Sequence, residues 1–506
     1  MTKKDGRLSS PSAPSKRDEI KLSREKLFRE GSKFNPATRE DVIGIDNVLG
    51  IADQLVHWLV NFKQYEALKA RPEPGVIFEG DPGTGKTLVA RYIATASRAL
   101  FIDMRDFRYE GNEMSARDVA DLFSLTRATY EKNQQPIILF WDEFEHYAAD
   151  RMHAGKDQAT VISQLTAELD GAKGKVHGVL MIGCTNYIEI IDEALMRPGR
   201  LGLQVEFTAP SRSGKVAIMK HYLNRFPIDE IDLSSMSYFL GGDETAAAIE
   251  ETVEEAWRLA VRRSLMTNEP PRLSREDLMG VCLDRMIGPA TSLSMLNRDM
   301  RLQVAIHECG HAIVALKLGL QLMLVTIRPT QGGRFGQTQI ASGPALEINR
   351  NYLEAHLTTG HAGAIAEERC GLRGAGCGGD MGSVSAIAQK VTINAPKQIP
   401  LAMSDIEHNR SGLLSEWLLR KSDKELIKLA KRARREARLI LASVSPETLT
   451  MIGESVVNAV TISGPEFAKL TAEHLGAEWI SDRFHLPGDE DSVRLISGDT
   501  WWSNVL

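Results

Sequence analysis

The sequence lacks the features that mark a secreted or membrane-spanning chain. No run approaches the roughly 18 consecutive apolar residues of a transmembrane helix, and the N-terminus has no apolar segment like that of a secretory signal. The five cysteines are odd in number and contain no C-x-x-C pair, which argues against a disulfide framework and fits a reducing compartment. A net charge of −6 indicates neither nucleic acid nor an anionic membrane surface as a partner. These absences predict a soluble, cytoplasmic protein.

What is present is an ordinary globular composition over 506 residues, with 43% hydrophobic and 25% charged residues. This length predicts about two to four domains. Short apolar runs that alternate with helical patterns, namely GVIFEG, PIILFW, GVLMIG and LQVEF, predict a parallel α/β sheet. We expect a polar, partly disordered tail at 1–38, an α/β domain at 39–212, a small helical lid at 213–292, a mainly α-helical domain at 293–485 and a C-terminal tail at 486–506.

A phosphate-binding loop follows the first predicted strand. The segment GDPGTGKT is a full G-x-x-x-x-G-K-[ST] motif between that strand and the helical pattern TLVARYIATA. Glycines let backbone N–H groups surround phosphates, Lys86 supplies a positive charge to the outer phosphates, and the Thr87 hydroxyl can bind Mg²⁺. The pattern predicts an ATP site, whose loop residues are Gly80, Asp81, Pro82, Gly83, Thr84, Gly85, Lys86 and Thr87.

Acidic residues that such a loop requires follow another predicted strand, in PIILFWDEFE. Asp142 is expected in the Mg²⁺ shell, and Glu143 is expected to orient or deprotonate the attacking water. Asn186 ends the strand VLMIGCTN and is placed to help position that water. Each residue alone would be an ordinary end of a strand or a turn, but beside a phosphate loop they favour nucleotide hydrolysis.

The stretch AIHECGHAIVALKLG contains the motif H-E-x-x-H. Because helical positions four apart share a face, His307 and His311 can bind one Zn²⁺, and Glu308 can act as general base on a water. The same pattern also arises by chance on buried helices. Cys309 points off the metal face, and we expect it to pack in a core. A catalytic zinc needs a third protein ligand.

Spacing leaves three candidates for that third ligand. Glu367 and Glu368 lie in GAIAEERCG, and Asp380 lies in GCGGDMGSVSAIAQ. No further histidine follows at the distance that the longer zinc-protease motifs require. The residues alone do not choose among the three carboxylates.

Taken together, the segments resemble a known family. GVIFEGDPGTGKTLVARYIA, WDEFE, GCTNYIEIIDEALMRPGRLGLQVEF and FLGGDETAAAIEE look like an AAA+ ATPase module, and HECGHAIVA, VTIRPTQGGRFGQTQ, AGAIAEE and GGDMGSVSAIAQ follow the order of the FtsH group of ATP-dependent zinc proteases. The similarity runs from about residue 38 to 470. It implies a homohexamer that acts on protein substrates with ATP, Mg²⁺ and Zn²⁺. It also implies Asp380 as the third ligand, with Glu367 and Glu368 in helix or outer-shell positions.

The chain departs from the family at three places. The family's RPGRFDRQ reads RPGRLGLQ, so Arg200 matches the first of two arginines that reach the neighbouring subunit's nucleotide, and Leu203 replaces the second. DFRYEGNE lies where the family grips polypeptide in its pore, which indicates Phe107 and Tyr109, whereas Glu110 replaces an aliphatic neighbour. The family's N-terminal membrane anchor has no counterpart, and a polar tail stands in its place.

The remaining signals do not change this interpretation. GRFGQTQIA is expected to be an edge strand that binds extended substrate. The run that holds the basic cluster from Lys428 to Arg438 also carries an apolar stripe at helical spacing, Leu426, Leu429, Ala433 and Ile440, so a solvated helix face is favoured over a nucleic-acid surface. The ending WWSNVL fits a docking tail or simple end packing. We expect an ATP-dependent zinc metalloendopeptidase; the alternative is a remodelling ATPase with an inactive, structural protease domain.

Overall fold

The computed structural model describes residues 16–70, 74–111, 113–149, 156–171, 178–242, 244–341, 350–372, 380 and 416–481. The chain divides into two compact units. Unit 1 holds the residues up to His221 and the segment that ends at Glu251, and unit 2 holds the rest. The predicted C-terminal tail, with WWSNVL, lies outside the described residues.

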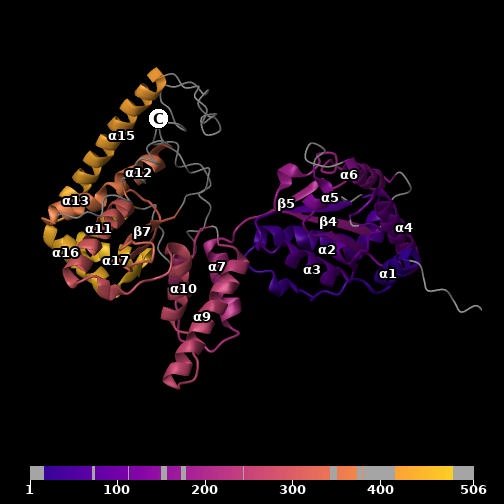
Figure 1. Ribbon diagram of the computed structural model, residues 1–506, viewed down its shortest axis with the longest axis horizontal. Helices are drawn as coiled ribbons and strands as arrows, with labels where there is room; N and C mark the ends of the chain where they lie inside the picture. Colours follow the sequence, from indigo (N-terminus) through magenta and orange to yellow (C-terminus); the bar gives the residue numbers. More distant parts are fainter. Residues whose placement is uncertain are drawn as a thin grey trace, which may run out of the picture. The chain divides into compact units, whose positions relative to one another are not determined.

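Unit 1 is built on a parallel sheet of five strands in the order β2-β3-β4-β1-β5 (Figure 1). The predicted parallel α/β architecture is therefore confirmed. The strands are β1 Gly75–Gly80, β2 Leu100–Asp103, β3 Ile137–Trp141, β4 Val179–Thr185 and β5 Leu203–Phe207. The helices are α1 Lys16–Glu30, α2 Asp46–Ala67, α3 Lys86–Ser97, α4 Ala116–Asn133, α5 Glu145–Ala148, α6 Lys156–Leu169 and α7 Arg212–Leu223, with 3-10 turns at Arg39–Asp41, Met104–Asp106 and Ile188–Ile190.

Helices cover both faces of this sheet (Figure 1). Side chains alternate along a strand, so Ile138 and Phe140 of β3 join the core beneath α2 and α3. Ile137, Leu139 and Trp141 join the opposite core beneath α4 and α6. Burial on both faces explains why the strands read as continuous apolar runs in the sequence. Packing of helices on both faces fixes the positions of the carboxyl ends of the strands, where the predicted nucleotide residues lie.

Within the segment expected as a polar, partly disordered tail through residue 38, the described residues Lys16–Glu30 form helix α1. Ile20, Arg24 and Phe28 are buried and lie four residues apart, so they share one helical face. Phe28 joins the core on the α4 and α6 side of the sheet. The apolar stripe is narrow and contains an arginine, and composition alone therefore did not reveal it.

Arg24 is held by four contacts in the core of unit 1. Its guanidinium forms ion pairs with Asp118 and, at 3.0 Å, with Asp121. It also donates to the Arg108 carbonyl at 2.8 Å and lies 4.5 Å from the centre of the Phe107 ring. The side chain of Arg24 is only 5% exposed, and that of Asp118 is 1% exposed. Helix α1 is therefore joined by buried charge to α4 and to the loop after β2.

We expect Arg24→Ala to lower the free energy of unfolding of unit 1 by about 3–5 kcal/mol, because removal of one partner leaves a buried carboxylate without its counter-charge. Thermal and urea unfolding of the full chain measure this loss. Arg29→Ala is the matched control on the same helix. Its partner Glu30 is exposed, so the expected cost is about 1 kcal/mol or less. Equal costs for the two variants would contradict a special role for Arg24.

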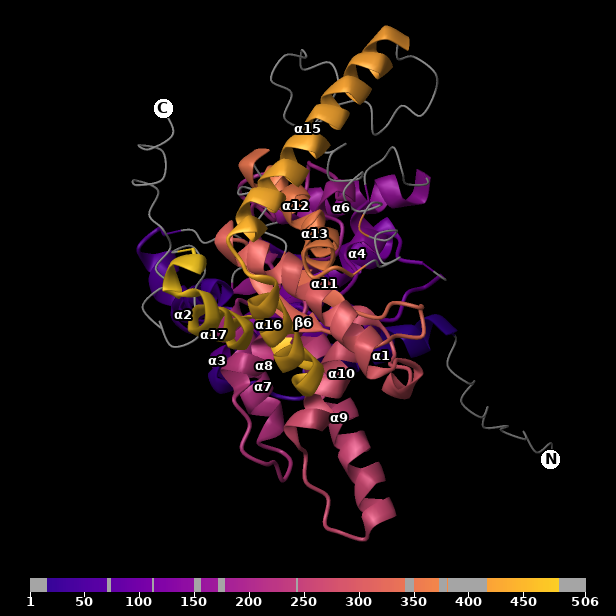
Figure 2. The same cartoon turned by 90° about the vertical axis from the view of Figure 1, so that its left-hand side faces the viewer.

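Unit 2 is mostly helical and contains a small antiparallel sheet in the order β7-β6-β8. Figure 2 shows α11 beside α13 and α16. The strands are β6 Leu322–Thr326, β7 Gln337–Ile340 and β8 Thr461–Ser463. The helices are α8 Leu233–Met236, α9 Ala246–Thr267 (which begins in unit 1), α10 Arg275–Ile287, α11 Arg298–Lys317, α12 Arg350–Gly360, α13 Ala362–Arg369, α15 Glu416–Ala442, α16 Pro446–Ala459 and α17 Gly464–Leu475, with 3-10 turns at Ser237–Phe239, Leu293–Met295 and Ala477–Trp479.

Helix α11 runs through the core of unit 2 and is buried at every residue from Ala305 to Leu316. Gly310 makes this packing possible, since a Cβ there would lie 2.7 Å from the Ala362 carbonyl oxygen of α13. Cys309 is fully buried in the same core, as expected. A helix without a solvated face can hold polar side chains only where other polar groups pair with them. Such pairing is found at residues 307, 308 and 311.

Helix α15 carries the basic cluster. Leu429 and Ala433 are buried, and the basic residues Lys428, Arg432 and Arg435 are exposed. The helix therefore turns an apolar face inward and a charged face to solvent. None of the helices in the part of the chain that the structure describes combines the length and apolarity needed to cross a bilayer.

Candidate functional site

The phosphate-loop motif joins β1 to the N-terminus of α3, as its pattern predicts. β1 ends at Gly80, and α3 begins at Lys86. Gly85 caps the helix in the left-handed region, with φ of 101°, which favours glycine. A helix N-terminus presents unpaired N–H groups and a partial positive charge, so it suits a phosphate. The described loop from Asp81 to Thr87 therefore has the backbone form that nucleotide binding requires.

Lys86 lies at the centre of this loop. Its Nζ donates to the carbonyl oxygens of Gly80 at 2.5 Å and Asp81 at 2.9 Å, and to Asn186 Oδ1 at 2.8 Å. Burial lowers the pKa of Lys86, so the ammonium group is partly desolvated and gains from an anionic partner. Asn186 at the end of β4 thus meets the loop at the position where outer phosphates are expected.

Asp142 and Glu143 follow β3, next to β4 in the sheet. Burial raises the pKa of Asp142, and Arg105, whose Nη1 lies 3.4 Å from Asp142 Oδ2, opposes that rise. Glu143 adopts a positive φ of 51°, which is uncommon for a residue other than glycine. Its side chain is 69% exposed. The exposed carboxylate is therefore available to a water.

Arg105 was not among the residues that the sequence indicated. It follows β2, and its contact with Asp142 exists because parallel neighbours β2 and β3 end at the same edge of the sheet. Its guanidinium also pairs with Asp103 at 2.6 Å. No sequence motif marks this position; only the strand order does.

Arg200 is held within its own protomer. Its guanidinium forms two hydrogen bonds with the Asp170 carboxylate, at 2.7 and 2.8 Å, and one with the Ala194 carbonyl oxygen. Leu203, which occupies the place of the family's second arginine, begins β5, pairs with Val76 in the sheet and packs against the core beneath α2 and α3. Arg200 therefore keeps a positive charge at the first of these positions, paired with Asp170. Leu203 at the second position is part of the apolar packing.

The loop predicted to grip polypeptide is packed within unit 1, against its own core. Phe107 is only 2% exposed and belongs to the core, so in this conformation its ring is not available to a substrate. Tyr109 is half-buried, and its hydroxyl lies 3.3 Å from the Tyr147 hydroxyl. Burial raises the pKa of Tyr109. Glu110 pairs with Arg17 of α1 at 3.3 Å, so this family departure has a partner within the chain.

The motif residues of α11 meet Asp380, which is helical in the structure. The Nε2 atoms of His307 and His311 lie 3.1 Å apart, and Asp380 Oδ2 lies 2.7 Å from the first and 3.3 Å from the second. The three possible ligand atoms all lie within 4.8 Å of one another. Among the described residues this is the group of histidine, cysteine and carboxylate side chains that can hold a metal ion.

Each histidine is held in its orientation by a hydrogen bond at Nδ1, the ring nitrogen that does not face the cluster. His307 Nδ1 lies 2.5 Å from Glu367 Oε1, and Gln303 Nε2 donates to the other oxygen of that carboxylate at 3.0 Å. His311 Nδ1 donates to the Thr359 carbonyl oxygen at 2.7 Å. Such backing fixes the ring tautomer and directs Nε2 toward a metal. Glu367 therefore contacts the rear of a candidate ligand, and Glu368 is exposed and paired with Arg438.

These residues fit zinc. Tetrahedral ligands at the usual Zn–N distance are separated by roughly 3.3 Å, close to the 3.1 Å between the imidazole nitrogens. Gly363 leaves the necessary space, since a Cβ there would lie 2.5 Å from both Nε2 atoms. Burial opposes charge on His307, and hydrogen bonds with Asp380 and Glu367 raise its pKa. Metal binding requires the neutral imidazole, so a metal and a proton compete for this site.

Glu308 lies beside this cluster and is buried. Thr338 of β7 places its hydroxyl 2.7 Å from Glu308 Oε2. Burial raises the pKa of Glu308, and the nearby His311 and His307 oppose the rise. Thr338 was not among the predicted site residues, although it lies in the segment expected to form the substrate-binding edge strand.

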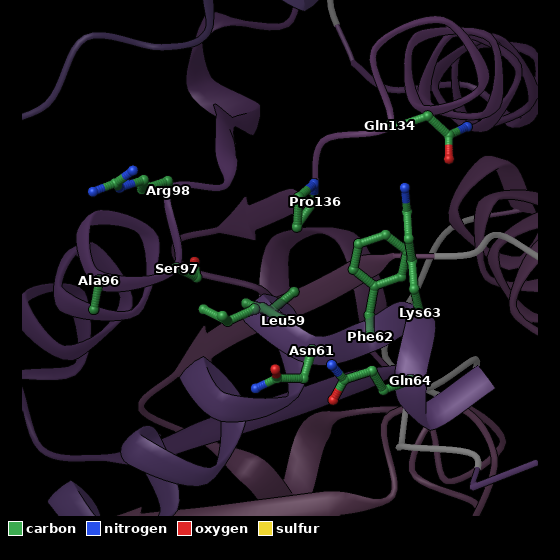
Figure 3. A pocket seen from close by; sticks show the side chains of 11 residues that line it. Leu59, Asn61, Phe62, Lys63, Gln64, Ala96, Ser97, Arg98, Gln134 and Pro136 are labelled. Atoms are coloured by element: carbon green, nitrogen blue, oxygen red, sulfur yellow. The ribbon is translucent and has the colours of Figure 1, made fainter. Parts of the chain in front are cut away.

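A separate cavity of about 650 Å³ lies at the C-terminal ends of α2 and α3 (Figure 3). Lys63, Phe62 and Arg98 line it. Lys86 is at the opposite end of α3, a helix of 12 residues, which is roughly 18 Å long. The cavity is therefore distinct from the nucleotide residues.

Comparison with known proteins finds a family match in the first part of the chain and relatives over most of its length. Residues 76–209 match the ATPase family associated with various cellular activities (AAA). The chain is 31% identical over 404 residues to the ATP-dependent zinc metalloprotease FtsH of Pseudomonas putida. This aligned region covers 77% of this chain and 63% of that relative. FtsH 2 of Symbiobacterium thermophilum is 32% identical over 376 residues, covering 71% and 61%. FtsH of Streptococcus pneumoniae is 26% identical over 484 residues, covering 90% and 72%. The chain thus spans less than two thirds of the first two relatives.

Proposed function

We propose that this AAA ATPase, whose FtsH homologues share about 30% identity with it over most of its length, is an ATP-dependent zinc metalloendopeptidase. The observation that carries the proposal is the convergence of His307, His311 and Asp380 beside the buried Glu308. The H-E-x-x-H pattern alone arises by chance on buried helices. A third carboxylate and fixed imidazole tautomers are what a catalytic metal needs in addition.

His307, His311 and Asp380 would hold Zn²⁺, which when bound polarises the scissile carbonyl and acidifies the attacking water. Glu308 takes the proton from that water, because its carboxylate lies next to the first ligand on α11. Glu367 and the Thr359 carbonyl keep the two imidazoles in position. The two histidines and Glu308 are buried in α11, whereas the Asp380 side chain is 32% exposed.

ATP would supply mechanical work and take no part in peptide chemistry. Lys86 and the loop backbone bind the phosphates, Asp142 and Thr87 hold Mg²⁺, and Glu143 activates the water. We propose a homohexamer in which Arg200 reaches the neighbour's nucleotide, and protein substrates as the material that is unfolded and cleaved. Tyr109 is the proposed contact with the moving polypeptide. Phe107, which is buried, would support that loop from the core.

Metal analysis combined with casein degradation tests the proposal. We expect about one zinc per chain and casein cleavage that requires both zinc and ATP. ATP hydrolysis with no cleavage at full zinc occupancy would favour the remodelling ATPase with a structural protease domain. Cleavage that proceeds equally without ATP would separate the two activities and contradict the coupled mechanism.

Glu143→Gln should retain ATP binding and lose about 10²–10⁴-fold in hydrolysis, because Lys86 and Asp142 keep the phosphates and Mg²⁺. Titration with a fluorescent nucleotide measures binding, and phosphate release measures turnover. Lys86→Ala is the comparison that should weaken binding itself. Hydrolysis by Glu143→Gln at the parent rate would show that another group activates the water.

A further inference from the structure

The segment from Gly336 to Thr338 lies directly against the Glu308 carboxylate. Thr338 Oγ1 lies 2.7 Å from Glu308 Oε2 and 2.9 Å from the Glu308 carbonyl oxygen. Gly336 adjoins the other carboxylate oxygen, since a Cβ at residue 336 would lie 2.9 Å from Glu308 Oε1 and 3.0 Å from its Cγ. Two residues of one short segment thus contact the two oxygens of one buried side chain.

The two contacts differ in kind. A threonine hydroxyl can donate one hydrogen bond, and a carboxylate oxygen that accepts it is fixed in place. Gly336 lies at a closely packed point, since a Cβ there would also lie 2.6 Å from Val304 Cγ1 of α11. The segment can therefore approach the carboxylate only with glycine at residue 336, and Oε2 is the oxygen that the Thr338 hydroxyl holds.

We infer that Thr338 is a positioning residue for the base Glu308, and that Gly336 allows this segment to lie against the carboxylate; this inference rests on the proposed peptidase function. In the reaction the water oxygen bonds to the scissile carbonyl carbon, and the water proton passes to the Glu308 carboxylate. That proton then goes to the amide nitrogen as the C–N bond breaks. The products are a carboxylic acid and an amine, so atoms and charge balance.

The position of this pair on β7 links substrate docking to catalysis. Within the described part of the chain β7 pairs with β6 alone, and an extended peptide would pair with its other edge. Side chains alternate along a strand, and Gln337 and Gln339, whose side chains bond to each other at 2.7 Å, share the face opposite Thr338. Backbone pairing with substrate thus governs binding, and the Thr338 hydroxyl governs the orientation of the base.

Thr338→Val and Thr338→Ser test the inference on a short internally quenched peptide, with Zn²⁺ as the metal. We expect Thr338→Val to lower kcat by about 10–100-fold with KM unchanged, and Thr338→Ser to restore most of the loss because it keeps the hydroxyl. Zinc content should equal that of the parent in both variants. Thr471→Val is the matched control, since it removes a buried hydroxyl that bonds only within its own helix, and its kcat should not change.

Crystal structures of the metal-free variants supply a readout that does not depend on activity. We expect one Glu308 conformation in the parent and in Thr338→Ser, and a rotated or divided carboxylate in Thr338→Val. Gly336→Ala should displace the same side chain while Thr338 remains. A parent kcat in Thr338→Val, equal losses in Val and Ser, or loss of zinc from Thr338→Val would overturn the inference. Absence of zinc-dependent cleavage by the parent would instead defeat the proposed function, and the crystal structures would still test how Glu308 is held.

Discussion

Replacing Glu308 with Gln should lower peptide cleavage by about 10²–10⁴-fold, the usual contribution of a general base, and should leave zinc content and ATP hydrolysis intact. The amide cannot take a proton from water, whereas His307, His311 and Asp380 are unchanged. Cleavage of a quenched peptide, metal analysis and phosphate release on the same preparation measure the three quantities. Glu368→Gln makes the same chemical change at an exposed position and should have no effect.

Asp380→Ala should also lose peptide cleavage, but through loss of zinc. Removing the carboxylate takes one of three candidate ligands, so zinc content falls together with cleavage. If Asp380→Ala keeps its zinc, the third-ligand role returns to Glu367 or Glu368. If Glu308→Gln retains ATP-dependent proteolysis, Glu308 is not the base. The two variants therefore separate loss of metal from loss of proton transfer.

Arg200→Ala should lower ATP hydrolysis by about 10³–10⁵-fold, because a finger arginine stabilises charge on the γ-phosphate and Leu203 leaves no second finger. Asp170→Ala is the matched control. It breaks the same ion pair within the protomer and keeps the guanidinium, so most activity should remain. Equal losses would mean that the pair matters only for local folding.

Mixing subunits tests whether Arg200 acts on a neighbour. Arg200→Ala subunits have intact nucleotide residues, and Glu143→Gln subunits have an intact Arg200, so a mixture of the two inactive proteins should regain part of the ATPase rate. Leu203→Arg should destabilise rather than accelerate, because Leu203 packs against the core at the start of β5. A rate per subunit that survives both Arg200→Ala and dilution to monomer would contradict the ring mechanism.

Much of the fold and the two motifs could be predicted because their patterns are local. Strand β1, the glycines and Lys86 are contiguous in sequence, and their conformation follows from the properties of those residue types. The spacing of His307 and His311 places both on one helical face whatever surrounds them. The parallel sheet was predictable from buried apolar runs, and the structure confirms it.

Tertiary structure decided what depends on distant residues. Spacing left Glu367, Glu368 and Asp380 open, and family resemblance indicated Asp380. The structure brings the Asp380 carboxylate to the two Nε2 atoms and turns Glu367 to the opposite side of His307. The position of Glu367 depends on how α11 and α13 pack, and no sequence interval encodes that packing.

The same reason accounts for the other differences. Helix α1 was expected as part of a polar tail, yet Arg24 is stabilised there by Asp118, whose place in the sequence gives no sign of the contact. Thr338 reaches Glu308 only because β7 lies beside α11. Sequence alone determined which chemistry the chain carries, since motifs are short and local. The tertiary structure decided which side chains orient that chemistry, because partners far apart in sequence meet only through packing.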